Sequence, residues 1–292
     1  MDELGYVPNH AGRSLRIGSS QALGLLVPDV SNPFYAELAR GVEDVAQSLG
    51  FNVLLCNTNF ERTREERYAH VFRSGVVDGL IYAAAASGGY GSERLARDLP
   101  VVVVNETPGD IQLDTVNTDN ERGGELAGEH LRGLGHTSVL VIDGPPGSPT
   151  SDSRRTGFER AFAGTDVTLG HRCGDYRGPS AARIIGRELE ERGAWFTAVY
   201  AANDVMAVAA IGALQTGGLT VPDEVSVVGY DDSVLAALVT PALTTIRQPI
   251  YEMGRAGAER LVAVIGGSRP SEALHTKLAV ELVERASTKR RR

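Results

Sequence analysis

Four polar side chains follow closely on two short apolar runs, at 198–202 and 225–228. They are Asn203, Asp204, Asp231 and Asp232. Runs of this length and composition are typical of buried strands. In open parallel sheets the ligand crevice lies beyond the carboxyl ends of the strands, so these groups are placed to hydrogen-bond a small polar molecule. A plainer alternative stays open, in which Asp204 only caps a helix and one of the paired aspartates only opens a turn.

The segment between the two runs predicts a helix. Asn203-Asp204 is a good helix N-cap, and apolar residues then recur at helical spacing from Met206 to Leu214. Gly217-Gly218 ends the helix, and Pro222 prevents its return. The unit is therefore a strand, a helix and a parallel strand.

The same alternation extends over most of the chain. Further strands are predicted at Leu23–Val27, Val53–Cys56, Leu80–Tyr82, Val101–Val104, Ser138–Ile142 and Leu278–Val283, with helical patterns between most of them. Alternating units of this kind predict an α/β protein whose parallel sheets are covered by helices on both faces. A length of 292 residues fits two sheets in series better than one.

Composition narrows the class of protein. The net charge of −8 argues against a surface that binds nucleic acid throughout, although it leaves room for a small DNA-binding appendage. The two cysteines, Cys56 and Cys173, are far apart and have no metal-type spacing. The sequence shows neither a signal peptide nor an apolar run long enough to span a membrane, so we expect a cytoplasmic protein without a membrane partner.

Two motifs carry a family resemblance. Residues 202–207 read Ala-Asn-Asp-x-Met-Ala, and residues 221–232 read Val-Pro-x-x-Val-Ser-Val-Val-Gly-Tyr-Asp-Asp. Both resemble the effector domain of bacterial transcription regulators of the lac repressor/galactose repressor (LacI/GalR) family. Residues 5–15, Gly-Tyr-Val-Pro-Asn-x-x-x-Arg-Ser-Leu, resemble the junction of that domain with the DNA-binding domain. The resemblance covers residues 4–287.

This resemblance implies a two-lobe, periplasmic-binding-protein-like (type I) fold in which the chain crosses between the lobes three times. The implied parts are a remnant of the DNA-binding domain with the hinge segment (1–20), an N-terminal lobe (21–135 plus 249–269), a C-terminal lobe (136–246 plus 272–286) and a solvated tail (287–292). The helix-turn-helix would precede Leu4, so this chain alone is not expected to read a base sequence.

The hinge residues implied by the resemblance are Asn9, Arg13, Leu15 and Arg16. Leu15 matches a leucine that enters the DNA minor groove, and the two arginines would lie near phosphates. Gly12 would weaken such a helix by up to ~1 kcal/mol relative to alanine. The residues alone also allow a frayed polar arm, because a helix this short is unstable in water.

The resemblance also implies an effector site with contributions from both lobes. Its residues are Phe34, Tyr35, Asn105, Arg154, Tyr176, Asn203, Asp231 and Gln248. The guanidinium of Arg154 would offer paired donors to hydroxyls or a carboxylate, and Tyr176 would stack on a ligand ring. Asp231 would accept hydrogen bonds from paired hydroxyls. Many relatives carry Asp where this chain has Asn105, so hydrogen bonding is kept there and a charge is lost.

Plainer roles remain open for some of these positions. Phe34 is equally well explained as a core side chain. Arg155 is interpreted as a surface neighbour of the functional arginine. Gln248 lies at a crossover and is explained at least as well by a role in bridging the lobes.

These patterns predict a ligand-responsive transcription regulator, a repressor, that binds a small metabolite such as a sugar between its lobes. Its partners would be a second copy of the chain and, in the full-length protein, operator DNA. A periplasmic solute-binding protein of a sugar importer is the alternative, and the hinge-type segment favours the regulator. A third class, an enzyme, is not favoured because the phosphate-loop, zinc-protease and nucleophile-elbow motifs are absent. We therefore expect no catalytic residue, no cofactor and no metal.

Overall fold

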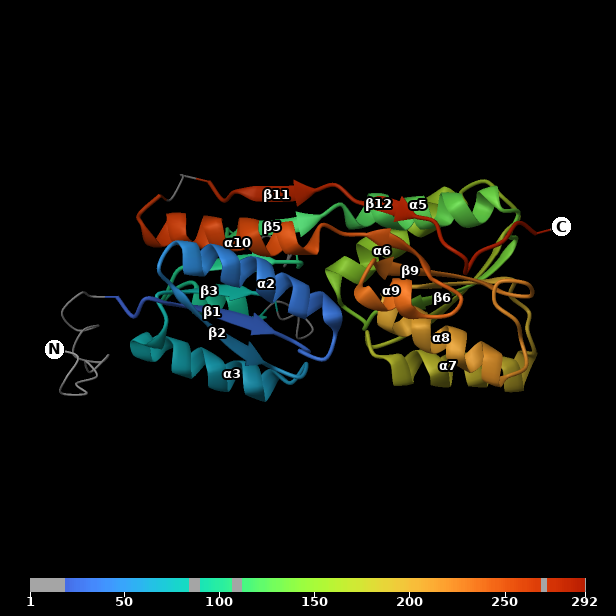
Figure 1. Cartoon of the computed structure of the whole chain (residues 1–292), viewed down its shortest axis with the longest axis horizontal. Coiled ribbons are helices and arrows are strands. Elements are labelled where there is room, and N and C mark those ends of the chain that lie inside the picture. The colour runs from blue at the N-terminus through green and yellow to red at the C-terminus, as the bar shows by residue number, and fades with distance from the viewer. Residues whose placement is uncertain (1–18, 84–89, 107–111, 269–271, 292) are drawn as a thin grey trace, which may run out of the picture.

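A computed structural model describes residues 19–83, 90–106, 112–268 and 272–291. These residues form two lobes that lie side by side along the long axis of the molecule (Figure 1). Each lobe holds a six-stranded, mostly parallel sheet with helices on both faces, which confirms the predicted α/β class. The predicted hinge residues Asn9, Arg13, Leu15 and Arg16 lie outside the described residues.

The sheet of the first lobe has the strand order β11-β5-β4-β3-β1-β2. Its strands are β1 (Ala22–Val27), β2 (Asn52–Asn57), β3 (Gly79–Tyr82), β4 (Val101–Val104), β5 (Asp114–Thr118) and β11 (His275–Leu278). The helices are α2 (Pro33–Ser48), α3 (Arg62–Val71), which continues into a π-helix (η2, Phe72–Val76), α4 (Tyr90–Leu95) and α10 (Ile250–Ile265).

Alternation along β1 explains how this sheet is covered on both faces. Leu25 packs into a core with Leu38 of α2, whereas the next residue, Leu26, packs with Phe72 on the opposite face. Every residue of β4 is buried, as expected of a central parallel strand with helices on both sides.

The sheet of the second lobe has the strand order β12-β10-β9-β8-β6-β7. Its strands are β6 (Ser138–Asp143), β7 (Thr168–Cys173), β8 (Ala198–Ala201), β9 (Ser226–Asp231), β10 (Thr244–Arg247) and β12 (Glu281–Val283). Its helices are α5 (Asn120–Gly133), α6 (Pro149–Ala161), α7 (Gly178–Arg192), α8 (Asp204–Thr216) and α9 (Val234–Leu238).

At the carboxyl ends of β1, β6 and β8, the following helix has a polar N-cap. The side chain of Asn32 accepts a hydrogen bond from the backbone of α2, Ser148 does the same for α6, and Asn203 does so for α8. A proline at the first helical position of α2 and of α6 supports these starts. These caps fix how the chain turns from the carboxyl end of β1, β6 and β8 into the following helix.

Helix α5 falls within the range 21–135 that was expected to form the N-terminal lobe, but it belongs to the second lobe. Ala127 of α5 lies in the second-lobe core with Phe158 of α6. The two helices approach closely because glycines face the partner backbone: a Cβ on Gly157 would lie 1.8 Å from the carbonyl oxygen of Glu121. The expected boundary at residue 135 is therefore wrong, and the first crossing lies between β5 and α5.

The expected single strand at Leu278–Val283 is also wrong. It is divided between the lobes: β11 pairs in parallel with β5 of the first sheet, and β12 pairs antiparallel with β10 of the second. Segment 272–278 therefore belongs to the first lobe. The chain crosses three times, as predicted, after β5, after β10 and after β11.

The expected solvated tail at 287–292 begins inside the second lobe. Ser287 is fully buried, and its hydroxyl donates to the carbonyl oxygen of Val227 at 2.6 Å. Further along, the backbone N–H of Arg291 donates to the carbonyl oxygen of Leu134 at 2.7 Å. Residues 287–291 are thus anchored to the fold by hydrogen bonds that sequence composition does not indicate.

Candidate functional site

A pocket lies between the two lobes, at the carboxyl ends of β1, β4, β6, β8 and β9. Its lining residues are Asp29, Asn32, Phe34, Tyr35, Phe60, Asn105, Glu106, Thr150, Arg154, Tyr176, Asn203 and Asp231. Seven of the eight residues predicted for the effector site are among them, and Gln248 stands behind Asp231. The structure thus brings the predicted residues together.

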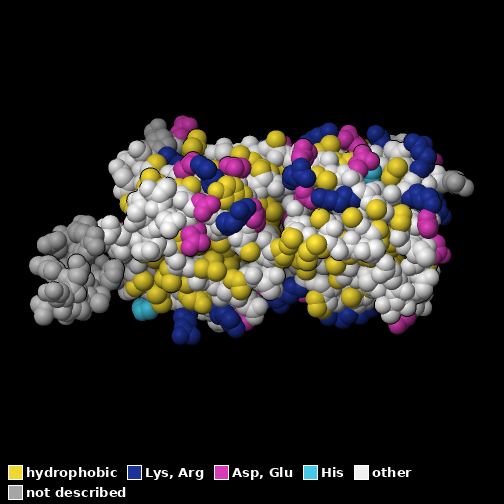
Figure 2. Space-filling model, viewed as in Figure 1, with side chains coloured by type: hydrophobic (Ala, Val, Ile, Leu, Met, Phe, Trp, Pro, Cys, Tyr) yellow, Lys and Arg dark blue, Asp and Glu magenta, His cyan; other side chains and the backbone are white. Residues whose placement is uncertain are grey.

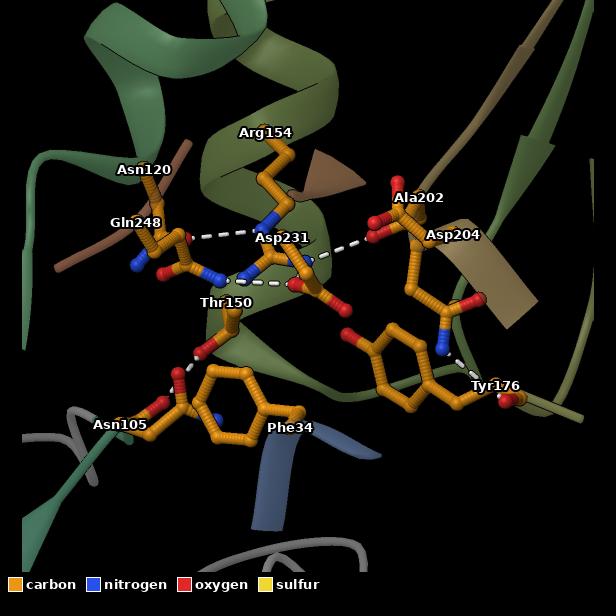
Figure 3. Close-up of polar contacts among 12 residues, drawn as sticks. Phe34, Asn105, Asn120, Thr150, Arg154, Tyr176, Ala202, Asp204, Asp231 and Gln248 are labelled. Atoms are coloured by element: carbon orange, nitrogen blue, oxygen red, sulfur yellow. Dashed lines mark hydrogen bonds and ion pairs between the residues drawn. The ribbon is translucent and has the colours of Figure 1, made fainter. Parts of the chain in front are cut away.

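Phe34 and Tyr35 form the wall contributed by the start of α2. Their rings meet edge to face with centroids 4.9 Å apart. Phe34 belongs to the first-lobe core and also lines the pocket, so a core role and a ligand-facing role are both compatible with its position. Figure 3 shows its ring below Asp231 in the view, beside Asn105.

Arg154 of α6 is buried, with only 3% of its surface exposed, and several contacts hold its guanidinium in place. Its Nε donates to Oδ1 of Asn120 at 2.8 Å, and its Nη1 donates to the carbonyl oxygen of Ala202 at 2.6 Å (Figure 3). The guanidinium also stacks on the ring of Tyr230, 3.8 Å from its centroid. A planar cation fixed in this way is suited to directional binding of a polar ligand. The neighbouring Arg155 is exposed and pairs with Asp152, as expected of a surface residue.

Asp231 lies opposite Arg154, with Oδ1 3.9 Å from Nη1. The amide of Gln248 donates to the same oxygen at 2.8 Å, and the Gln248 carbonyl accepts from Thr118 at 2.6 Å. Thr118 belongs to the first sheet and Asp231 to the second, so Gln248 bridges the lobes and orients the aspartate. Of the two roles left open for Gln248, this geometry favours the bridging one.

The carboxyl group of Asp204 supports Asp231 from inside the second lobe. It is fully buried and accepts hydrogen bonds from the Ser233 backbone at 2.7 Å and from the Thr245 hydroxyl at 2.6 Å. Burial raises the pKa of Asp204, and the nearby Asp231 raises it further because two negative charges repel each other. Burial likewise raises the pKa of Asp231, against the opposing effect of Arg154. Asp204 therefore fixes the turn after β9, while Asn203 is the helix cap.

Tyr176 faces the pocket from the second lobe. Its hydroxyl lies 3.0 Å from the Ser148 hydroxyl, and its ring lies so close to Gly144 that a Cβ there would be 2.4 Å from Cζ. Asn203 donates to the Tyr176 carbonyl at 3.0 Å and uses its own carbonyl to cap α8. Asn203 lines the pocket, but both ends of its amide are engaged within the protein, so it positions Tyr176.

Several lining residues have left-handed backbone conformations. The φ angles are 59° at Phe60, 64° at Asn105, 64° at Tyr176 and 120° at Asp231. Non-glycine residues rarely adopt such angles, and they concentrate at functional sites where the surrounding structure enforces them. The pocket is therefore the part of the described chain where backbone strain accumulates next to buried polar groups.

Sequence reasoning missed Glu106 and Thr150. Glu106 follows Asn105 at the end of β4, is 6% exposed, and has a pKa raised to about 7 by burial. Thr150 of α6 reaches across the cleft, where its hydroxyl lies 2.9 Å from the Asn105 carbonyl and 3.2 Å from Oε2 of Glu106. The position of Glu106 directly after a strand was the available signal.

Arg177 closes the rim of the cleft from the second lobe. Its Nη2 donates to Oδ1 of Asn59 at 2.7 Å, its Nε lies 3.7 Å from Asp29, and its guanidinium lies over the Phe60 ring. The space that admits the centre of a water molecule is ≈ 30 Å³, enough for about two waters. A sugar-sized ligand therefore requires the lobes to separate or the lining side chains to move.

Other classes of site receive no support from the described residues. They contain no group of three His, Cys, Asp or Glu side chains that could hold a metal ion. None of the helices in the described part of the chain is long and apolar enough to cross a membrane.

Comparison with known proteins first defines the class. A model of the periplasmic binding protein-like domain matches residues 128–288. The HTH-type transcriptional regulator DegA of Bacillus subtilis (strain 168) is 33% identical over 297 residues, which cover 99% of this chain and 87% of DegA. The chain therefore contains a periplasmic-binding-protein-like domain and resembles a transcription regulator over almost its whole length.

Solved structures similar to this chain are also transcription regulators. A LacI family transcriptional regulator from Enterococcus faecium with bound ribose is 32% identical, covers 93% of this chain and 100% of its own, and has a TM-score of 0.80. The lac repressor dimer bound to operator and an anti-inducer is 25% identical, covers 98% of this chain and 100% of its own, and has a TM-score of 0.85. This chain belongs to the LacI/GalR family of transcription regulators. Its relatives are regulators and not enzymes, and this favours the regulator over a solute-binding protein.

Proposed function

We propose that the interlobe pocket binds a small hydroxyl-rich metabolite, a sugar or a sugar derivative, as the effector of a repressor. The observation that carries the proposal is the facing arrangement of Arg154 and Asp231 beside the rings of Phe34 and Tyr176 (Figure 3). Hydroxyl groups hydrogen-bond both to a fixed guanidinium and to a carboxylate, and the apolar face of a sugar ring suits an aromatic surface. The Enterococcus faecium relative holds ribose, which supports this ligand class.

The proposed response is a shift between two arrangements of the lobes. Thr150 joins α6 to Asn105 across the cleft, and Arg177 joins the second lobe to Asn59 of the first. A ligand bound among these contacts favours one arrangement only by its differential affinity for the two. In a dimer, such a shift changes the spacing of the hinge segments at Asn9, Arg13, Leu15 and Arg16, and thereby the affinity for operator DNA.

We propose that the working form is a cytoplasmic homodimer, and the dimer of the lac repressor relative on its operator supports the dimeric part of this proposal. Leu54 and Leu55 lie exposed on β2, the edge strand of the first sheet. Figure 2 shows hydrophobic side chains gathered on the part of the first lobe where β2 lies. A second copy covering this face would bury these side chains. Light scattering should give twice the mass of the chain, and a monomer at micromolar concentration would contradict the proposal.

The effector proposal is tested by thermal-shift and calorimetric titration of the chain with neutral sugars, sugar phosphates, purines and amino acids. A ligand at ~100 times its dissociation constant should stabilise the protein by about 2.7 kcal/mol. Arg154→Lys and Asp231→Asn should each abolish the shift, whereas the matched control Arg155→Lys, at the exposed neighbour, should keep it. A ligand that binds all three variants as it binds the unaltered chain would place the effector site elsewhere.

A further inference from the structure

The carboxylate of Glu106 is a buried acceptor with little of its capacity used. Glu106 lines the pocket and is 6% exposed. Among the described residues its hydrogen-bond partner is the hydroxyl of Thr150, at 3.2 Å. That hydroxyl has one proton, and it lies closer to the backbone carbonyl oxygen of Asn105, at 2.9 Å. Glu106 therefore has at most a share of one hydrogen bond, although an ionised carboxylate accepts several.

A second acceptor in the same wall is also unpaired. Oδ1 of Asn105 is buried and has no hydrogen-bond partner among the described residues. Figure 3 shows Asn105 and Thr150 on one side of the pocket, with Tyr176 on the other. Buried polar atoms are nearly always hydrogen-bonded, and an orphaned acceptor destabilises the folded state. A ligand that supplies hydrogen-bond donors would satisfy both of these acceptors, the Glu106 carboxylate and Oδ1 of Asn105.

The charges that line the pocket do not balance. Three carboxylates face one guanidinium: Asp29, Glu106 and Asp231 against Arg154. Arg154 lies within 3.9 Å of Asp231, and Asp29 is 3.7 Å from Arg177 at the rim. Among the described residues Glu106 makes no ion pair, and Arg154 acts on it only through its charge at longer range. In its ionised form this group would repel a ligand phosphate or carboxylate and would attract a hydroxyl or an ammonium.

We propose that Glu106 is a specificity-determining residue, which accepts a hydrogen bond from the effector and restricts the pocket to uncharged or amino-bearing sugars in preference to phosphorylated or acidic ones. This inference rests on the proposed function and deepens it, since it names the charge class of the effector. Burial raises the pKa of the unliganded Glu106 side chain, and a donor from the ligand would stabilise its ionised form.

The test is a calorimetric titration of the whole chain with matched probes: D-ribose, D-glucose and D-galactose, with the 5- or 6-phosphate of each, and glucosamine and galactosamine. We expect one neutral or amino sugar to bind, and its phosphate to bind at least tenfold more weakly. Glu106→Gln keeps the shape and removes the charge. It should weaken the neutral or amino sugar about tenfold and narrow its advantage over the phosphate. Glu43→Gln, at an exposed position of α2, should change neither value.

Each outcome decides the matter. A sugar phosphate that binds as tightly as its parent sugar would overturn the role of Glu106 and leave the effector pocket standing. A neutral sugar that binds the unaltered chain and Glu106→Gln equally well would do the same. Failure of every probe to bind would instead count against the sugar-binding function, and the inference would fall with it. Circular dichroism and the urea midpoint of Glu106→Gln verify that the variant is folded.

Discussion

Replacement of Glu106 by glutamine should make the unliganded protein more stable, and increasingly so as the pH rises. Burial holds the pKa of this carboxyl group at about 7, above its ordinary value of 4.5. The group is therefore harder to ionise in the folded state than in the unfolded chain. A folded pKa above the unfolded one means stability that is fully present below pH ~4.5 and is lost as the pH rises through 7. Glutamine does not titrate, so the variant escapes this loss.

The size of the effect follows from the two pKa values. Integrated over the titration, the loss between pH 5 and pH 8 is on the order of 2 kcal/mol of unfolding free energy. Arg154 faces Glu106 and stays charged throughout this range. Asp231 and Asp204 also have raised pKa values, but both are present in the variant and cancel in the comparison.

The assay is urea unfolding of the unaltered chain, Glu106→Gln and the control Glu43→Gln at pH 5, 6, 7 and 8. The stability advantage of Glu106→Gln should grow with pH, while the control should follow the unaltered chain. Equal urea m-values in the proteins compared would support reading the midpoints as stability. Substitutions at the surface typically change stability by up to about 0.5 kcal/mol. The electrostatic reasoning would therefore be refuted if the stability difference between Glu106→Gln and the unaltered chain changed by less than this between pH 5 and pH 8, or if it shrank as the pH rose.

Two further substitutions probe how the site is supported. Gly157→Ala would place a Cβ 1.8 Å from the Glu121 carbonyl oxygen and force α5 from α6, so urea unfolding should show a loss of about 2 kcal/mol or more. Gly133→Ala, where the added Cβ meets nothing within 4 Å, is its control; equal stability of the two variants would contradict the close approach of these helices. Asn203→Ala should cost about 1 kcal/mol through loss of the α8 cap and should also weaken effector binding, because Tyr176 loses a support. Asn203→Asp keeps the cap acceptor and lacks the amide donor, so it should restore stability without restoring affinity; recovery of both would show that Asn203 does not act through Tyr176.

Local patterns identified most of the elements that carry the pocket. The strand at Val101–Val104 and the helix after Asn203 follow from apolar runs, caps and helical spacing, which act within a few residues. The choice of Arg154 over Arg155 came from the family resemblance, and the structure agrees that only the first is buried at the pocket. The roles of these residues toward an effector stay predictions until a ligand is bound.

Contacts between distant segments explain what was missed. The length of α5 can be predicted from the sequence. The lobe to which α5 belongs depends on the close packing of Gly124 and Gly157 against the backbone of the facing helix. Segment 275–283 has the composition of one strand, and its division arises because β5 and β10 offer free edges in different sheets. Neither partner is visible within a local window.

By itself, then, the sequence determined the alternating α/β pattern, the two-lobe class and the chemical types gathered at the strand ends. Only the tertiary structure decided which partners and how much solvent each of these side chains meets. It buries Glu106 so that, among the described residues, the Thr150 hydroxyl is its side-chain hydrogen-bond partner, and it engages both ends of the Asn203 amide. It also sets Gln248 between Thr118 and Asp231, residues of different lobes. The physical reason is that solvation and hydrogen-bond partners belong to the space around a side chain, and distant parts of the chain create that space.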